Sequence, residues 1–309
     1  MDPASRVKFV FWLRLLGAFL VLCLVIAWRL GERGDGAGSG GPMGPVVIAA
    51  AGDISCPQGP DGPTTCEDQA TSDLLLQLHL NLVLLLGDNQ YDHGRLADYN
   101  AYYDPTWGRL KSITKPAPGN HEYETQGASG YFTYFGSVAK GGYYSFDIGA
   151  WHVLSLDSEI DASPGSAQYQ WAQADLSSHG GTTCVLAYWH KARWGSGGHF
   201  SDPSMTDMWN LLYDNGADLV LSGHNHQYER FAPLDKSGNI DTARGMREFV
   251  VGVGGKDFYS FGTPLKGSEK RDNTHYGVLK LVLRTASYDW KFIAAPSQSI
   301  IDSGTQACH

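Results

Sequence analysis

The stretch "ADLVLSGHNH", residues 217–226, sets a pattern that recurs along the chain. A short apolar run ends at Leu221 and gives way at once to His224 and His226, two positions apart. Continuous apolar runs of about four to six residues are typical of strands that are buried on both faces. Two imidazoles that follow such a strand are either structural polar groups or half of a metal site.

Four other segments have the same form, an apolar run that stops at a polar cluster. They are "VVIAAAGDIS" (46–55), "LNLVLLLGDNQY" (80–91), "SITKPAPGNHE" (112–122) and "TTCVLAYWHK" (182–191). Helix-like stretches cover 67–79, 166–178 and 202–216, where Pro203 suits a first helical position and Gly216 a C-terminal cap. The alternation of strand and helix predicts a layered α/β fold whose helices cover the sheets.

Two segments alternate residue by residue and favour antiparallel or mixed pairing at the sheet edges. Residues 141–159 predict two strands around Gly149, and residues 276–295 predict a hairpin around 285–287. The sheets are therefore expected to be mixed.

Composition limits both the organisation of the chain and its partners. The 309 residues, 42% of them hydrophobic, suit one large domain with an appendage. Acidic residues outnumber basic ones by 32 to 23, which gives a net charge of -9, and no basic block occurs beyond the N-terminus. Binding to a nucleic-acid backbone is therefore not expected.

The N-terminal segment 1–30 combines Arg6 and Lys8 with a long apolar run to Trp28. This is the pattern of a signal peptide or a signal anchor, and the absence of an A-x-A site after the run favours an uncleaved membrane anchor. Residues 31–44 are rich in glycine and predict a flexible linker. Residues 45–309 then form the main domain, which is expected to lie outside the cytoplasm, either anchored or secreted.

Four cysteines lie outside the apolar segment, and an even number suits an oxidising compartment. Three pairings are possible. We favour Cys56 with Cys66 and Cys184 with Cys308 over four free thiols, whereas Cys23 in the apolar segment is expected to stay reduced.

Polar side chains at successive strand ends suggest a metal centre, because the sites of open α/β sheets lie at the carboxyl ends of the strands. Carboxylate, amide and imidazole donors together suit zinc, iron or manganese better than calcium. The set is too large for one tetrahedral ion, and with Asp88 shared it divides between two ions. The donors are Asp53, Asp88, Asn120, His190, His224 and His226, with His121 beside them.

The ordered blocks "GD" (52–53), "GDNQY" (87–91), "GNHE" (119–122), His190 and "GHNHQYER" (223–230) resemble the calcineurin-like metallophosphoesterase superfamily. Within it, the chain is most similar to the purple acid phosphatases and their bacterial relatives. Ser55 stands where the wider superfamily has a histidine, Tyr91 stands where purple acid phosphatases have a tyrosine, and they share the "YER" at 228–230. The resemblance, over residues 46–293, implies an α/β/β/α sandwich with mixed sheets and a dinuclear metal site at the C-terminal ends of the strands.

The resemblance also implies a set of metal ligands. A phenolate from Tyr91 favours iron at the first position, with zinc, iron or manganese as its partner. The alternative is that Tyr91 only donates a hydrogen bond near the metal. The first ion would be held by Asp53, Asp88, Tyr91 and His226, and the second by Asp88, Asn120, His190 and His224.

The activity implied is hydrolysis of phosphomonoesters of small molecules by direct attack of a metal-activated hydroxide, without a phosphoenzyme. His121 is the candidate general acid and Glu122 is expected to orient it, although His121 could instead be structural. The alternatives are a phosphodiesterase or nucleotide pyrophosphatase on the same site, and a tethered protein that binds metal or phosphate without turnover.

Lys191 departs from the family pattern, because a second histidine is expected close to His190. Lys191 is a candidate substrate-binding residue, since an ammonium can hold a phosphate oxygen. Arg193 and His199 are nearby substitutes, although both are expected to be surface residues, and Asn225 reads as a spacer between the two histidines.

Two loops have alternative interpretations. The aromatic-rich residues 92–110 either line the substrate entrance or form a packed lid. Residues 249–261, "FVVGVGGKDFYSF", lack the spacing of a phosphate-binding loop and favour a tight strand exit.

Overall fold

The computed structural model describes residues 44–57, 66–179 and 184–309, of which Gly44 to His309 belong to one compact unit. The predicted anchor at 1–30 and almost all of the predicted linker lie outside the described residues. Over the part of the chain that is described, no helix is both long and apolar enough to cross a membrane.

The first sheet contains six strands in the order β13-β12-β11-β1-β2-β3 among the described residues. Its strands β1, β2 and β3 run parallel, and the other three are antiparallel. Pro116 lies in β3, at the sheet edge, where its missing N–H costs no central hydrogen bond. The strands are β1 (Val46–Ala51), β2 (Leu82–Leu86), β3 (Thr114–Ala117), β11 (Gly277–Leu283), β12 (Ser287–Ala294) and β13 (Ile300–Ala307).

The second sheet has seven strands in the order β10-β8-β9-β7-β6-β5-β4 within the same described ranges. Its central strands β5, β6, β7 and β9 are parallel, and antiparallel strands flank them on both sides. The prediction of mixed sheets is confirmed. The strands are β4 (Tyr144–Ile148), β5 (Trp151–Ser155), β6 (Cys184–Lys191), β7 (Leu219–Gly223), β8 (Tyr228–Phe231), β9 (Arg247–Val251) and β10 (Ser268–Asp272).

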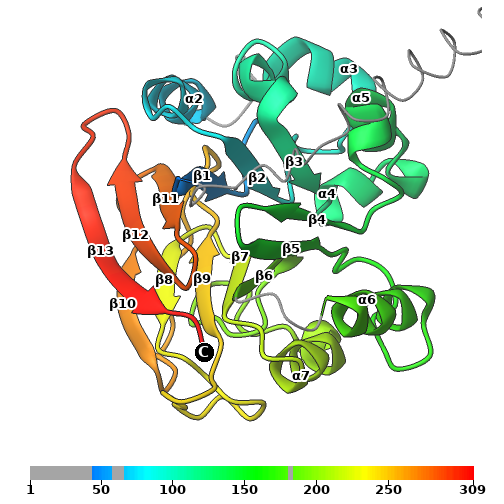
Figure 1. The fold of residues 1–309 in the computed structure, drawn as a ribbon. Helices are drawn as coiled ribbons and strands as arrows, with labels where there is room; N and C mark the ends of the chain where they lie inside the picture. Colours follow the sequence, from blue (N-terminus) through cyan, green and yellow to red (C-terminus); the bar gives the residue numbers. More distant parts are fainter. Residues whose placement is uncertain (1–43, 58–65, 180–183) are drawn as a thin grey trace, which may run out of the picture. The chain divides into compact units, whose positions relative to one another are not determined.

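Helices cover the outer face of each sheet and complete the predicted α/β/β/α sandwich (Figure 1). The first sheet carries α2 (Asp68–Gln77), α3 (Leu96–Asp98) and α5 (Ser129–Phe135), and the second carries α6 (Ala167–Ser178) and α7 (Thr206–Asp214). The single turn α4 (Asn120–Tyr123) follows β3. The other helical segments that the structure describes are the π-helix Tyr99–Tyr103 and the 3-10 helices Trp107–Ile113, Gln126–Ala128, Gly136–Val138 and Pro203–Met205.

Two buried layers stabilise this arrangement. Between the sheets, Ile48 and Leu84 of the first sheet join one apolar cluster with Leu186 and Leu219 of the second. On the other side of the second sheet, Trp189 packs with side chains of α6 and α7 in a separate cluster. The continuous apolar runs are explained, because each central strand is covered on both faces.

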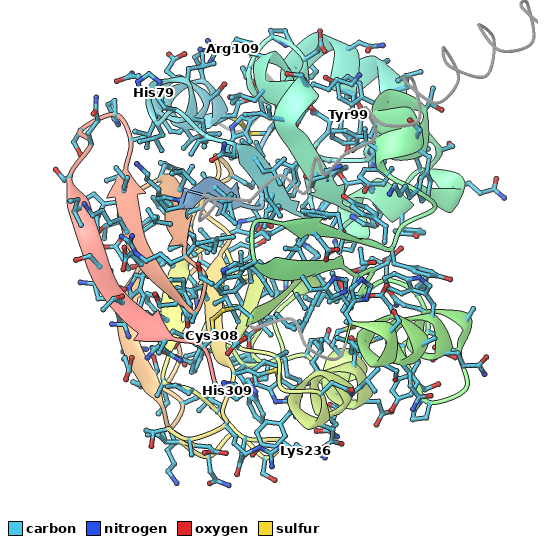
Figure 2. The ribbon with its side chains drawn as sticks, in the orientation of Figure 1. His79, Tyr99, Arg109, Lys236, Cys308 and His309 are labelled. Atoms are coloured by element: carbon cyan, nitrogen blue, oxygen red, sulfur yellow. A yellow bond between two sulfur atoms is a disulfide. The ribbon has the colours of Figure 1, made fainter. Side chains whose placement is uncertain are left out.

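Both favoured disulfides are present, Cys56–Cys66 and Cys184–Cys308. Cys184 is the first residue of β6 and Cys308 directly follows β13, so the second bond joins the two sheets near the end of the chain (Figure 2).

The structure corrects two expectations and settles two alternatives. The predicted helix 202–216 is divided into a 3-10 turn and α7, and β13 was not predicted. The aromatic loop is a packed lid, because Tyr99, Tyr103 and Trp107 are buried. The glycine-rich segment after β9 is a tight exit, since Gly254 and Lys256 donate main-chain hydrogen bonds to Gly52 and Asp53.

Candidate metal centre

The predicted donors converge where the carboxyl ends of both sheets meet. Asp53 and Asp88 follow the parallel strands β1 and β2, and Asn120 begins α4 just after β3. From the second sheet, His190 lies near the end of β6 and His224 directly follows β7. Parallel strands deliver their C-terminal loops to one edge, so residues far apart in the sequence become neighbours.

One group of donors gathers around His190. Its Nε2 lies 3.1 Å from Asp88 Oδ2, 3.2 Å from Asn120 Oδ1 and 3.1 Å from His224 Nδ1. Its other ring nitrogen, Nδ1, lies 2.8 Å from the main-chain oxygen of Leu86, which can only accept, so the proton belongs on Nδ1. Asp88, His190 and His224 bring one ligand atom each to within 4.8 Å of one another.

A second group surrounds the hydroxyl of Tyr91. This oxygen lies 2.8 Å from Asp53 Oδ1, 3.1 Å from Asp88 Oδ2 and 3.0 Å from His226 Nε2. His226 Nδ1 lies 2.6 Å from the main-chain oxygen of Asp257, which leaves Nε2 directed at the cluster. Asp88 Oδ2 therefore contacts both groups, the position that a shared bridging ligand requires.

Close backbone packing explains why the predicted motifs contain glycine. A Cβ atom on Gly87 would lie 2.5 Å from Cβ of His190, and one on Gly119 would lie 2.3 Å from Asp88 Oδ1. Asp53, Asp88 and His224 themselves adopt positive φ angles of 58°, 46° and 66°. Such angles are uncommon for residues other than glycine, and they cluster at functional sites.

The electrostatics of the cluster call for positive charge. Burial would raise the pKa of Asp88, but His190 and His121 outweigh it and hold that pKa well below its usual range. Burial would lower the pKa of His190, yet the charge of Asp88 raises it to about 10. For His224, burial together with His190 lowers the pKa to about 3. The buried carboxylates of Asp53 and Asp88 thus hold a proton on the imidazole of His190, where cations could bind instead. The donor set fits a pair of metal ions.

His121 lies at the side of the cluster. Its Nδ1 lies 2.5 Å from the main-chain oxygen of Asp92, its ring packs on Tyr91 at 4.3 Å, and its Nε2 lies 3.9 Å from Asp88 Oδ2. The proton on Nδ1 is held by that oxygen, so Nε2 faces the centre. The expectation that Glu122 orients His121 is wrong, because the Asp92 carbonyl does so.

Glu122 supports the loops instead. Its buried carboxylate accepts hydrogen bonds from the main-chain N–H groups of Asn89, Gln90 and Gly119 and from the hydroxyl of Tyr99. Burial and the nearby Asp88 raise the pKa of Glu122 to about 8.

The three residues considered as substrate contacts, Lys191, Arg193 and His199, have different surroundings. Lys191 Nζ lies 2.7 Å from Glu159 Oε2, so the ammonium has an ion-pair partner, and its role in substrate binding stays a prediction. Arg193 stacks on the ring of Trp194 at 3.9 Å. His199 is exposed, as expected of a surface residue, and its ring also stacks on that of His224, with 4.0 Å between the ring centres.

Asn225 is not a spacer. Its side chain is fully buried and joins the loop of His224 and His226 to the loop that carries His199. Asn225 Oδ1 accepts from the main-chain N–H of His199 at 2.8 Å, and Nδ2 donates to the main-chain oxygen of Phe200 at 3.0 Å. No periodicity in the sequence signals this contact.

Two further residues at the site were missed. The ring of Tyr259 stacks on His226 at 3.9 Å, and Lys256 Nζ lies 4.9 Å from the centre of the Tyr91 ring. Both lie in the segment after β9, which the sequence analysis interpreted only as a strand exit. Its aromatic and basic residues were the available signal.

The sandwich and its donor cluster define a class of protein, and residues 46–228 match the calcineurin-like phosphoesterase family. The chain belongs to that family. Its similar relatives include purple acid phosphatase 18 of Arabidopsis thaliana, 31% identical over 233 residues that cover 68% of this chain and 50% of that protein. Purple acid phosphatase 15 of the same plant is 28% identical over 225 residues, which cover 60% and 41%. The chain thus spans about half the length of the curated relatives it matches.

Solved structures agree on the fold. A purple acid phosphatase from yellow lupin (Lupinus luteus) seeds superposes with a TM-score of 0.70 at 20% identity, over 85% of this chain and 54% of that one. A dimetal phosphatase from Danio rerio gives 0.57 at 12% identity, over 85% and 99%. At these identities the likeness shows the fold alone.

Proposed function

We propose that this protein is a metal-dependent phosphatase that hydrolyses phosphomonoesters of small molecules at a dinuclear centre. The observation that carries the proposal is the double contact of Asp88 Oδ2, which lies 3.1 Å from both His190 Nε2 and the hydroxyl of Tyr91. A carboxylate oxygen between two donor groups suits two ions that share one ligand. The family match and the purple acid phosphatase relatives support the same activity.

The residues assigned to each ion follow the two groups. Asp53, Asp88, Tyr91 and His226 would hold one ion, for which the phenol favours iron, and Asp88, Asn120, His190 and His224 would hold the other, zinc, iron or manganese. When bound, such ions neutralise phosphate charge and lower the pKa of water toward neutrality.

Side chains around the cluster would position the ester and supply a proton. His121 directs Nε2 at the centre, with the Nδ1 proton held by the Asp92 carbonyl, so in its imidazolium form it can give the proton on Nε2 to the leaving alkoxide and become neutral. His199, stacked on His224, offers a second imidazole at the entrance. Water attacks phosphorus directly, and no serine or cysteine nucleophile takes part.

The activity test compares p-nitrophenyl phosphate with bis(p-nitrophenyl) phosphate. We expect the monoester to be the better substrate, with turnover abolished in Asn120→Ala and His224→Ala. Preference for the diester would identify a phosphodiesterase or pyrophosphatase instead. Turnover that is absent, or that survives in both variants, would contradict the proposed centre.

Metal analysis tests the ligand assignment. We expect about two ions per chain and a visible tyrosinate-to-iron absorption band that disappears in Tyr91→Phe. A colourless protein, or a band that survives the substitution, would refute the role of Tyr91.

We also propose that the catalytic domain works outside the cytoplasm and does not bind nucleic acid. Two disulfides in the described residues suit an oxidising compartment, and the net charge of -9 disfavours a polyanionic partner. Whether residues 1–30 tether the protein to a membrane stays a prediction.

A further inference from the structure

A second group of histidine and aspartate side chains lies far from the candidate centre. Asp147 on β4 pairs directly with His152 on β5, and His152 pairs in turn with Val185 near the start of β6. His190 lies five positions further along β6, about 16 Å away along an extended strand. This group therefore occupies the opposite end of the second sheet, where α6 ends.

His152 is buried, and both of its ring nitrogens face carboxylates. Nε2 lies 2.7 Å from Asp175 Oδ2, and Nδ1 lies 2.7 Å from Asp147 Oδ1. Asp175 is itself held by the hydroxyl of Ser145, 2.8 Å from Oδ1. Ionised carboxylates only accept, so each 2.7 Å contact needs a proton between its two atoms or a cation that both atoms bind.

The proton of a neutral His152 belongs on Nε2, because the anchored Asp175 accepts it there. Nδ1 then turns a lone pair toward Asp147. A histidine that gives one N–H to a carboxylate and presents the other nitrogen outward has the arrangement of a metal ligand.

His179 adds a second imidazole. Its Nδ1 lies 2.8 Å from the main-chain oxygen of Asp175, which can only accept, so Nδ1 carries the proton. Nε2 therefore turns its lone pair toward Asp147 Oδ2, 3.9 Å away. The ring stacks on that of His152 at 3.8 Å.

The three side chains are close enough to share one ion, and two of them are open to solvent. Asp147, His152 and His179 each bring one ligand atom to within 4.8 Å of the others. Asp147 is 63% exposed and His179 32%, so an ion can enter from solvent. His152 is only 1% exposed and is held in place by Asp175.

We propose that Asp147, His152 and His179 bind a divalent transition-metal ion of the zinc type. Two imidazole nitrogens and one carboxylate are a donor set that Zn²⁺ accepts, with water in the remaining position. Asp175 orients His152 and does not bind the ion. This site is independent of the phosphatase centre.

The test is the zinc content of the full protein after it is stripped with a chelator, reloaded with ZnCl₂ and desalted. His179→Gln and Asp147→Asn should each hold one equivalent less than wild type. His79→Gln, which removes an exposed histidine at the end of α2, is the matched control and should retain the wild-type content (Figure 2). The difference between variants is the readout, so it does not depend on how many ions the strand-end centre takes.

Two outcomes would overturn the proposal. Equal zinc content in wild type and both variants would mean that His152 is simply protonated between two aspartates. Loss of the same equivalent in His79→Gln would mean that the ion is bound elsewhere. Phosphatase activity should be unchanged in His179→Gln. Loss of activity in Asn120→Ala tests only the proposed phosphatase centre and not this zinc site.

Discussion

Replacing Asn225 with alanine tests whether the metal-ligand loop positions the loop at the site entrance. The substitution removes the two hydrogen bonds from the Asn225 side chain to the main chain of His199 and Phe200. Phe200 has a φ of 58°, unusual for a bulky residue, so its conformation depends on contacts such as these. Alanine at 225 leaves His224 and His226 in place and should not change metal content.

The expected fall in kcat/KM follows from the two lost hydrogen bonds. A net contribution of about 0.5 to 1.5 kcal/mol for each gives about 1 to 3 kcal/mol together. If that energy holds His199 over His224, kcat/KM should fall by ~5- to 150-fold. Steady-state kinetics on p-nitrophenyl phosphate measure this, beside metal analysis of the same samples.

The control is Asn81→Ala, at the start of β2. It also removes a hydrogen bond between an asparagine side chain and the main chain, the one that Asn81 Oδ1 accepts from Val47 N at 2.8 Å. Its kcat/KM should equal the wild-type value. Asn225→Ala kinetics within twofold of wild type, with metal retained, would refute the reasoning, because the loop would then be held without Asn225.

Two other substitutions probe single ion pairs. Lys191→His should retain metal and change the pH profile of kcat/KM; an unchanged profile would show that the position is catalytically silent. The same substitution should lower stability by about 1 to 3 kcal/mol, because Glu159, only 7% exposed, loses its ion-pair partner. The hydrogen bond from His309 Nδ1 to Asp218 raises the pKa of His309 above its ordinary value of 6.5, so its stabilisation is present below pH 6.5 and is lost as the pH rises through the raised pKa. His309→Ala should therefore lower the free energy of unfolding at pH 5.5 by only a fraction of ~1 kcal/mol, because the pair is partly exposed, and leave it nearly unchanged at pH 9. Urea unfolding at both pH values measures this difference. A larger loss of stability at pH 9 than at pH 5.5 would contradict the prediction.

The strand ends were predictable because they combine two local signals. A continuous apolar run marks a strand covered on both faces, and a glycine with a metal-binding side chain marks its exit, as at Gly87 and Asp88. The structure supplies the reason for the glycine, since the His190 side chain occupies the space that a Cβ would need. Local pattern and tertiary packing agree here.

Other features of the site could not be read from local pattern. Asn225 and His199 meet through a main-chain hydrogen bond across 26 residues, and neither lies on a periodic face. Strand β13 went unnoticed because its residues "IIDSGTQA" carry few apolar side chains, and its pairing with β12 is what defines it.

The sequence by itself determined the class of fold and the donors at five strand ends, because strand, cap and ligand preferences act over a few neighbouring residues. Only the tertiary structure decided that the Asp92 carbonyl rather than Glu122 orients His121, and that His152 and His179 meet beside Asp147. Those outcomes depend on the direction of single ring nitrogens and carboxylate oxygens, which is set only when sheets and helices pack together.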